Sequence, residues 1–214
     1  MLRRTVLACL LLFGITWQSE LCAQRLKTPF DHGTRYPRMS PFDYEHLRAE
    51  LRIDFEKEEV HGRVTHRGKS RRADLKGVVL DAVDIAVKSV KSGKGAALKH
   101  RAFADRIEID FSSPLGVGDE YSFVVEYHCR PKRGTYFRQA VKEYPKDARQ
   151  VWTQGEAELT RHYIPCFDSP SERLTTELLI RVPKNMDVLS NGEYVGRAEH
   201  DDGTHTVHWH QKIP

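Results

Sequence analysis

The nine residues LRAELRIDF, Leu47–Phe55, alternate strictly between apolar and charged side chains. Every second position from Leu47 is apolar, and the positions between hold arginine, glutamate or aspartate. Because successive side chains of a strand point to opposite faces of a sheet, this pattern predicts a strand with one buried and one solvated face. The following EKEE, 56–59, predicts a turn, and the apolar positions of 60–64 predict the hairpin partner.

Short strand-like segments continue along the rest of the chain, separated by turn residues. They are Leu75–Val90 (two strands and a bend), Arg106–Phe111, Tyr121–Tyr127, Glu177–Pro183, Glu193–Glu199 and His205–Ile213. Apolar stripes with a helical period are almost absent, and we find no internal repeat or dividing linker. The sequence therefore predicts an all-β fold, a sandwich or saddle of mostly antiparallel strands in a single domain.

The overall charge is nearly balanced. The 214 residues include 34 basic and 30 acidic side chains, a formal net charge of +4, and 39% are apolar. This balance is typical of a soluble globular protein and gives no extended basic surface for nucleic acid. The one basic cluster, HRGKSRR at His66–Arg72, is interpreted as a solvated turn between strands. We therefore expect no nucleic-acid partner.

The N-terminus has the organisation of a secretory signal peptide. MLRR is basic, Val6–Trp17 is apolar, and Leu21 and Ala23 can occupy the −3 and −1 positions of a cleavage site. The apolar run is shorter than the about 20 residues of a membrane span. We therefore expect no stable membrane span in the mature chain, with an uncleaved N-terminal anchor as the alternative.

These features predict how the chain is divided. Residues 1–23 are a signal peptide, 24–40 an extended lead-in and 41–214 a β-domain, and the product is exported to the periplasm or the extracellular space. Cleavage would leave two cysteines, Cys129 and Cys166. They either form a disulfide, as exported proteins allow, or are small buried apolar side chains.

Polar chemistry is concentrated in VWTQGEAELTRHYIPCFDSP, Val151–Pro170. Its hydrogen-bonding and titratable side chains are Gln154, Glu156, Glu158, Arg161, His162, Cys166 and Asp168. Such a density is typical of a functional site or of a buried polar network. The segment has neither the spacing of metal ligands nor a glycine-rich phosphate loop.

A self-sufficient catalytic centre is not recognisable. The pattern His-Glu-x-x-His, in which two histidines on one helix face bind zinc, is absent, and so is Gly-x-Ser-x-Gly. In HTVHWHQ, His208 and His210 share one face of the predicted strand, and His205 takes the other. We expect no carboxylate near them on that face and interpret it as the polar outer face of an edge strand, with a metal site as the alternative. The sequence thus predicts no metal ion and no catalytic residue in this chain.

Four motifs occur in a fixed order. LDAVDI (Leu80–Ile85) is a strand with Leu-Asp-Ala, and VEYHCRPKRGTYF (Val125–Phe137) is a tyrosine-containing strand followed by a glycine-containing turn. The run from Thr153 to Pro183 contains Thr-Gln-x-Glu-Ala and Pro-Cys-Phe-Asp-x-Pro, and VLSNG (Val188–Gly192) is a further turn. In this order they resemble the N-terminal domain of the M1 family of zinc aminopeptidases, from about Tyr44 to the end of the chain.

The resemblance implies a β-saddle that packs against a thermolysin-like catalytic domain. It implies that Gln154 hydrogen-bonds the substrate near the S1 side and that Glu156 helps to bind the free α-amino group of the peptide. A fixed carboxylate gives a cationic amine a charge-assisted hydrogen bond, and a neighbouring amide adds no second charge. The other motif residues are expected to be scaffold, with Asp168 bonding backbone donors in the turn. They are Arg161, Pro165, Cys166, Phe167, Asp168 and Pro170.

The sequence departs from the family pattern at its end. It stops at Pro214, close to where the family's catalytic domain begins, and the zinc ligands, the general-base glutamate, the Gly-Ala-Met-Glu-Asn motif and the transition-state tyrosine are absent. The zinc that the resemblance implies would therefore belong to the missing catalytic domain, and this chain is expected to be inactive alone.

Two interpretations stay open. The chain is either the exported N-terminal piece of a zinc aminopeptidase, from a truncated gene or a fragmentary gene model, or a free-standing β-domain that binds peptide N-termini or a protein partner without catalysis. If a catalytic domain covers it, we expect an exposed apolar patch around the loop Thr153–Pro170.

Overall fold

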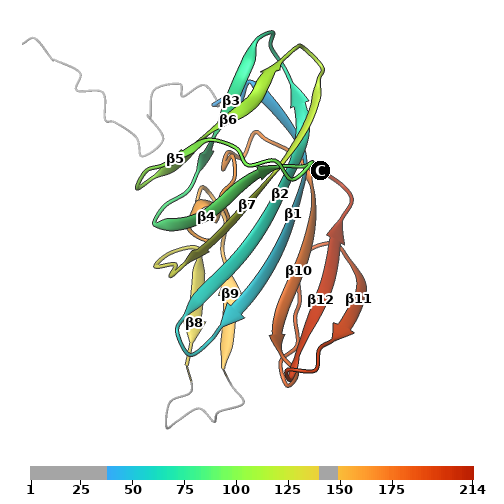
Figure 1. Ribbon diagram of the computed structural model, residues 1–214. Coiled ribbons are helices and arrows are strands. Elements are labelled where there is room, and N and C mark those ends of the chain that lie inside the picture. The colour runs from blue at the N-terminus through green and yellow to red at the C-terminus, as the bar shows by residue number, and fades with distance from the viewer. Residues whose placement is uncertain (1–37, 140–148) are drawn as a thin grey trace, which may run out of the picture. The chain divides into compact units, whose positions relative to one another are not determined.

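A computed structural model describes residues 38–139 and 149–214 (Figure 1). The predicted signal peptide, 1–23, and all but the last three residues of the predicted lead-in, 24–40, lie outside the described residues. In the described part the regular structure is β-strand, apart from one 3-10 turn at Thr160–His162. Within these same residues, none of the helical structure has the length and apolar content that crossing a membrane requires.

A seven-stranded sheet forms the main layer, in the order β11-β12-β10-β1-β2-β7-β4. All neighbours are antiparallel except β1 and β10, which are parallel. The strands are β1 (Phe42–Asp54), β2 (Glu59–Ser70), β4 (Ile85–Ser92), β7 (Glu120–Cys129), β10 (Thr175–Pro183), β11 (Glu193–Glu199) and β12 (Thr204–Gln211). The predicted all-β fold of mostly antiparallel strands is confirmed.

Two smaller sheets accompany the large one. A three-stranded sheet has the order β3-β6-β5, and β8 and β9 form a two-stranded hairpin. Their strands are β3 (Leu75–Asp81), β5 (His100–Ala102), β6 (Arg106–Leu115), β8 (Thr135–Arg138) and β9 (Gln150–Thr153). Figure 1 shows the three-stranded sheet on the side of β4 and β7, away from β10, β12 and β11.

The alternation of LRAELRIDF places its apolar residues in the core. Leu47, Ala49 and Leu51 are buried, whereas Arg52 on the other face is exposed. The buried faces of β1, β2, β7 and β4 meet those of β3 and β6 in one hydrophobic cluster. We call these four strands the covered half of the large sheet, and β10, β12 and β11 the uncovered half.

Two details of the sequence interpretation are wrong. The basic cluster His66–Arg72 is not a solvated turn, because β2 continues to Ser70 and His66 is 1% exposed. His66 follows Val64 on the inward face of β2, so the period of the strand takes it into the core. The strand at 205–213 is not an edge strand, because β11 pairs outside β12 and forms the edge of the sheet.

Candidate functional site

The polar segment Val151–Pro170 starts as strand β9 and continues as a loop that folds against the end of β3. The backbone N–H of Gln154 donates to the carbonyl oxygen of Gly134 at 2.9 Å, next to the start of β8. Gly134 has a φ of +77°, and a Cβ there would lie 2.3 Å from the Leu159 carbonyl oxygen, so the turn requires glycine. The hairpin and its glycine turn thus fix where Gln154 leaves the sheet.

Gln154 and Glu156 are exposed at the start of this loop. Neither side chain forms a hydrogen bond or ion pair with another residue in the parts of the chain that the structure describes. Glu158 differs, because its carboxylate pairs with Arg161 at 3.3 Å. The peptide bond between Glu156 and Ala157 is cis. An amide and a carboxylate are therefore presented without internal partners.

Asp81, at the end of β3, anchors the far side of the loop. Its carboxylate accepts the backbone N–H of Asp168 at 2.9 Å and pairs with the Arg38 guanidinium through both oxygens. Arg161 Nη1 lies 3.9 Å from the same carboxylate. Burial alone would raise the pKa of Asp81, but these hydrogen bonds and the nearby guanidinium outweigh it and lower the pKa. Asp81 is therefore a charged, buried anchor at neutral pH.

Arg161 and Asp168 close the loop on itself. The backbone N–H and Nε of Arg161 each donate to Oδ2 of Asp168 at 3.1 Å, and Nη2 donates to the Asp168 carbonyl oxygen at 2.8 Å. Charge-assisted hydrogen bonds of this kind are stronger than neutral ones. The two ends of the segment between them are therefore held in a fixed relation.

Core side chains hold the backbone of the loop from below. The hydroxyl of Tyr127 on β7 donates to the Tyr163 carbonyl oxygen at 2.5 Å, and Nε2 of His66 on β2 bonds the Pro165 carbonyl oxygen at 3.0 Å. Both side chains are about fully buried. They satisfy carbonyl groups that would otherwise be buried without partners, which is costly.

Cys166 and Cys129 are free thiols, so the disulfide alternative is not found. Cys166 exchanges backbone hydrogen bonds with Asp81 at 2.8 and 3.1 Å and is buried in the core. Burial raises the pKa of Cys129 to about 12 and that of Cys166 well above its usual value. Neither is a nucleophilic thiolate at neutral pH.

Phe167 and Pro170 complete the segment. The Phe167 ring stacks on Tyr44 of β1, with centroids 5.9 Å apart, and the Arg38 guanidinium lies over the Phe167 ring at 4.3 Å from its centroid. Pro170 is exposed. The structure thus separates the sequence-predicted site residues into an outward-facing pair, Gln154 and Glu156, and a set that makes internal contacts, apart from the exposed Pro170.

A cleft of about 1460 Å³ lies beside the loop. Among the residues that line it are Trp152, Gln154, Leu51, Leu178, Ile180 and Leu189. The exposed residues of the loop itself are polar or small, and the large exposed apolar side chain next to it is Trp152, at 53%. Among the described residues, exposed apolar surface is therefore found beside the loop Thr153–Pro170, at Trp152 of β9, rather than on the loop itself.

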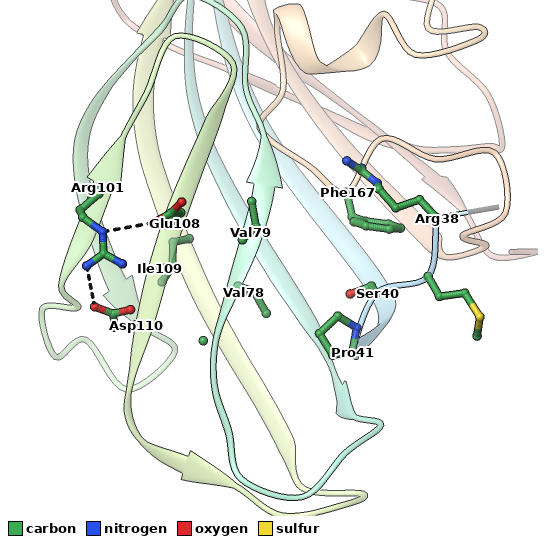
Figure 2. Close-up of a pocket in the computed structure, with 12 residues that line it drawn as sticks. Arg38, Ser40, Pro41, Val78, Val79, Arg101, Glu108, Ile109, Asp110 and Phe167 are labelled. Carbon is green, nitrogen blue, oxygen red and sulfur yellow. Dashed lines mark hydrogen bonds and ion pairs between the residues drawn. The ribbon is translucent and has the colours of Figure 1, made fainter. Parts of the chain in front are cut away.

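A second, smaller cavity of about 430 Å³ lies between residues 38–41 and strands β3 and β6 (Figure 2). Its charged wall is internally paired, because Arg101 bonds Glu108 at 3.1 Å and Asp110 at 3.4 Å. It touches the loop only through Phe167. This cavity offers no unpaired titratable group and is separate from Gln154 and Glu156.

Contacts between side chains of different strands were not predicted from the sequence. We expected no carboxylate near His208 and His210, but Glu177 of β10 lies between two histidines, with Oε2 2.9 Å from His208 Nε2 and Oε1 3.5 Å from His46 Nε2. The pairing of β10 with β12 creates this contact, and single-strand patterns do not predict it. The burial of His66 was predictable from the period of β2, whereas its bond to the loop was not.

Comparison with known proteins gives one family and one fold. The family model described as peptidase M1 N-terminal domain matches residues 41–214. Leucyl aminopeptidase of Saccharolobus solfataricus is 32% identical over 127 residues, which is 59% of this chain and 15% of that protein. Leukotriene A-4 hydrolase of Xenopus laevis is 25% identical over 188 residues, which is 81% of this chain and 30% of that protein.

Solved structures share the fold. The M1 zinc metallopeptidase of Deinococcus radiodurans superposes with a TM-score of 0.70 at 21% identity, over 83% of this chain and 40% of that chain. Native yeast LTA4 hydrolase superposes with a TM-score of 0.69 at 21% identity, over 85% of this chain and 29% of that chain. The match thus spans less than half of each of these longer relatives.

Proposed function

Because this chain belongs to the family of peptidase M1 N-terminal domains, we propose that it is the non-catalytic, substrate-facing part of an exported zinc aminopeptidase. In this role it packs against a thermolysin-like catalytic domain and contacts the N-terminus of a peptide substrate. The exported location rests on the leader-like sequence of residues 1–23.

The observation that carries the proposal is the contrast within Val151–Pro170. Gln154 and Glu156 are exposed and make no internal polar contact, whereas the loop that bears them is tied down by Asp81, His66 and Tyr127. Polar groups held by a rigid support lose little conformational entropy when a ligand binds. The geometry therefore suits recognition of a small, polar chain end.

Glu156 is proposed to bind the α-ammonium group of the substrate, and Gln154 to hydrogen-bond the first residue. A carboxylate and an ammonium form a charge-assisted hydrogen bond, which grows stronger when a second domain excludes water from the site. Gln154 can both donate and accept, so it can bond a peptide group without adding charge. Together they would select a free N-terminus over a blocked one.

Zinc is proposed to belong to the catalytic domain. The residues of this chain do not fit a His-Glu-x-x-His site, because that pattern does not occur in the 214 residues. When bound in its own domain, zinc polarises the scissile carbonyl group and lowers the pKa of a water. This chain contributes binding and orientation of the substrate, and no step of bond cleavage is assigned to it.

The cleft beside the loop is proposed to face the catalytic domain. Gln154 lies on its rim, and the half-buried Leu178 and Ile180 of β10 line it. Apolar surface of this kind is common where one domain packs on another. The substrate-facing pair would then sit at the boundary between the two domains.

The experiment is an NMR titration of the ¹⁵N-labelled chain with a tripeptide that has a free N-terminus and with its N-acetylated counterpart. We expect the free peptide to shift amide signals around Gln154 and Glu156, and the acetylated peptide to have no effect there. Glu156→Gln should remove the response. Glu158→Gln is the matched control, because Glu158 already pairs with Arg161, and it should retain the response.

Two results would contradict the proposal. One is equal binding of the free and acetylated peptides, or a response that Glu156→Gln leaves intact. The other is zinc-dependent hydrolysis of an aminoacyl reporter by the purified chain, since this would place the catalytic centre in these 214 residues.

A further inference from the structure

Three potential metal ligands converge at the hairpin between β1 and β2. One ligand atom of each of Asp54, Glu59 and His61 lies within 4.8 Å of those of the other two. The side chains are mostly covered, with exposed fractions of 16%, 12% and 24%. They lie apart from the loop Val151–Pro170 and take no part in the function proposed above.

The pairing of the two strands brings these residues together. Asp54 and Glu59 are direct cross-strand partners at the end of the hairpin, and His61 follows Glu59 on the same face of β2. Two carboxylates directly opposite each other repel and destabilise a strand pair. A cation between them would reverse that cost.

In each carboxylate, one oxygen accepts a hydrogen bond from a residue outside the cluster, and the other oxygen faces a different residue. Oε1 of Glu59 accepts from Arg130 Nε at 2.9 Å, and Oδ1 of Asp54 accepts the backbone N–H of Lys57 at 3.1 Å. Oε2 of Glu59 faces His61 Nε2 at 3.2 Å, and Oδ2 of Asp54 lies 3.8 Å from the exposed Lys57 Nζ. Ligating carboxylates are commonly oriented in this way, by bonds from surrounding groups.

The imidazole of His61 lies beside a second imidazole ring. His128 of β7 is its cross-strand partner, and the two rings are nearly parallel at 18°, with centroids 5.9 Å apart. Nδ1 of His128 is buried and has no hydrogen-bond partner among the described residues. The ring beside His61 therefore carries a nitrogen without a hydrogen-bond partner among the described residues.

We propose that Asp54, Glu59 and His61 bind one divalent transition-metal ion, with Zn²⁺ as the best match. Two carboxylate oxygens and an imidazole nitrogen suit Zn²⁺, whereas Ca²⁺ and Mg²⁺ prefer oxygen ligands alone. Tetrahedral ligands about 2.1 Å from Zn²⁺ lie about 3.4 Å apart, so a small side-chain rotation closes the site. The ion would clamp the end of the β1–β2 hairpin, with water completing its coordination.

The cluster around Glu177 is the internal rival. There each oxygen of one carboxylate faces a different histidine, His46 or His208, and Arg48 also donates to Oε2 at 3.0 Å. A guanidinium is bound in both clusters, Arg130 at Glu59 and Arg48 at Glu177, but the hairpin has a second carboxylate, that of Asp54, and therefore more negative charge to offer a cation. We therefore expect Zn²⁺ at the hairpin and not at Glu177.

The test is calorimetric titration of the full chain with Zn²⁺, Mn²⁺, Ca²⁺ and Mg²⁺, together with thermal unfolding in each ion. We expect one Zn²⁺ per chain, a raised Tm with Zn²⁺, and binding of Ca²⁺ and Mg²⁺ at least tenfold weaker. His61→Asn and the double variant Asp54→Asn, Glu59→Gln should each weaken Zn²⁺ binding by tenfold or more. His208→Asn is the matched control and should leave the affinity unchanged.

Imidazole NMR signals and metal-free unfolding separate the outcomes. The ¹⁵N ring signals of His61 should shift on addition of Zn²⁺, and those of His208 should not. Unfolding curves without metal show whether each variant is folded, so weaker binding in a folded variant supports the site. Zn²⁺ binding that survives in His61→Asn, disappears in His208→Asn, or is matched by Ca²⁺ would overturn the proposal.

Discussion

The two halves of the seven-stranded sheet have similar strand patterns and very different burial. In the covered half, Val64 of β2 and Phe123 and Val125 of β7 are completely buried, because β3 and β6 pack on them. In the uncovered half, one end of the inward face is also buried, at Val182, Val207 and His205, but Leu178 and Ile180 of β10 stay half-buried and line the cleft. An apolar alternation thus determines which face of a strand points inward and leaves open what covers that face.

The candidate site lies where these halves meet. The loop Val151–Pro170 is anchored on the covered half through His66 and Tyr127 and on β3 through Asp81, and Gln154 is among the residues that line the cleft beside the uncovered half. The covered half therefore acts as a rigid support for the loop, and the uncovered half has an accessible surface on which a second domain could pack. If a catalytic domain packs there, as proposed above, the support stays unchanged while the surface is buried.

The largest expected effect is the loss of a core side chain in the covered half. Phe123→Ala should lower the free energy of unfolding by about 3–5 kcal/mol, because it removes a fully buried ring and leaves a cavity among Phe42, Phe111 and His66. Urea unfolding of the full chain measures this change. If Phe123→Ala lowered the free energy of unfolding by less than Leu178→Ala does, the distinction between the two halves would be contradicted.

Removing the charged anchor should have the next largest effect. Asp81→Asn should cost about 2–3 kcal/mol, because the backbone N–H of Asp168 loses a charged acceptor and the guanidinium groups of Arg38 and Arg161 lose a nearby counter-charge. Asp84→Asn is the control, because Asp84 is exposed and its φ of +54° is one that asparagine tolerates. Equal unfolding free energies for the two variants would show that Asp81 is not an anchor.

Acid should weaken the support through His66. Burial lowers the pKa of His66 to about 4, against the small opposing effect of its bond to Pro165. In the unfolded chain the value is about 6.5, so the unfolded state binds more protons between these two pH values. The free energy of unfolding should therefore fall as pH drops from about 6.5 to about 4, by up to about 3 kcal/mol.

His66→Gln tests the source of this acid sensitivity, because the amide keeps a donor for Pro165 and does not titrate there. The variant should flatten the pH dependence between 6.5 and 4.5, measured by urea unfolding. His205 of the uncovered half is also completely buried, neither ring nitrogen has a partner among the described residues, and burial lowers its pKa. It adds to the loss in the same direction, as do His46, His61 and His162, whose pKa values are also lowered by burial, so His66→Gln should leave a residual slope that His205→Gln reduces further.

A structural feature of this chain could be predicted from the sequence when the residues that determine it are close together along the chain. The alternation of Leu47–Phe55 fixes a strand, because the period of a strand depends on neighbouring residues alone. The contact of Glu177 with His208 depends on a strand pairing 31 residues apart, and single-strand patterns do not contain it. The role of Asp81 likewise appears only when β3 meets the loop at Cys166, although the ordered motifs that resemble the family already included both residues.

The smallest effect, and the sharpest test of the comparison, is expected in the uncovered half. Leu178→Ala should cost about 1 kcal/mol in this chain, because the side chain is half-buried and water fills the vacated space at the cleft. Joined to the catalytic domain that we propose, the same substitution should cost about 2–5 kcal/mol, the range of a core leucine. A core-like cost in this chain alone would mean that the face is already covered. In that case unfolding that depends on protein concentration would identify a second copy as the cover.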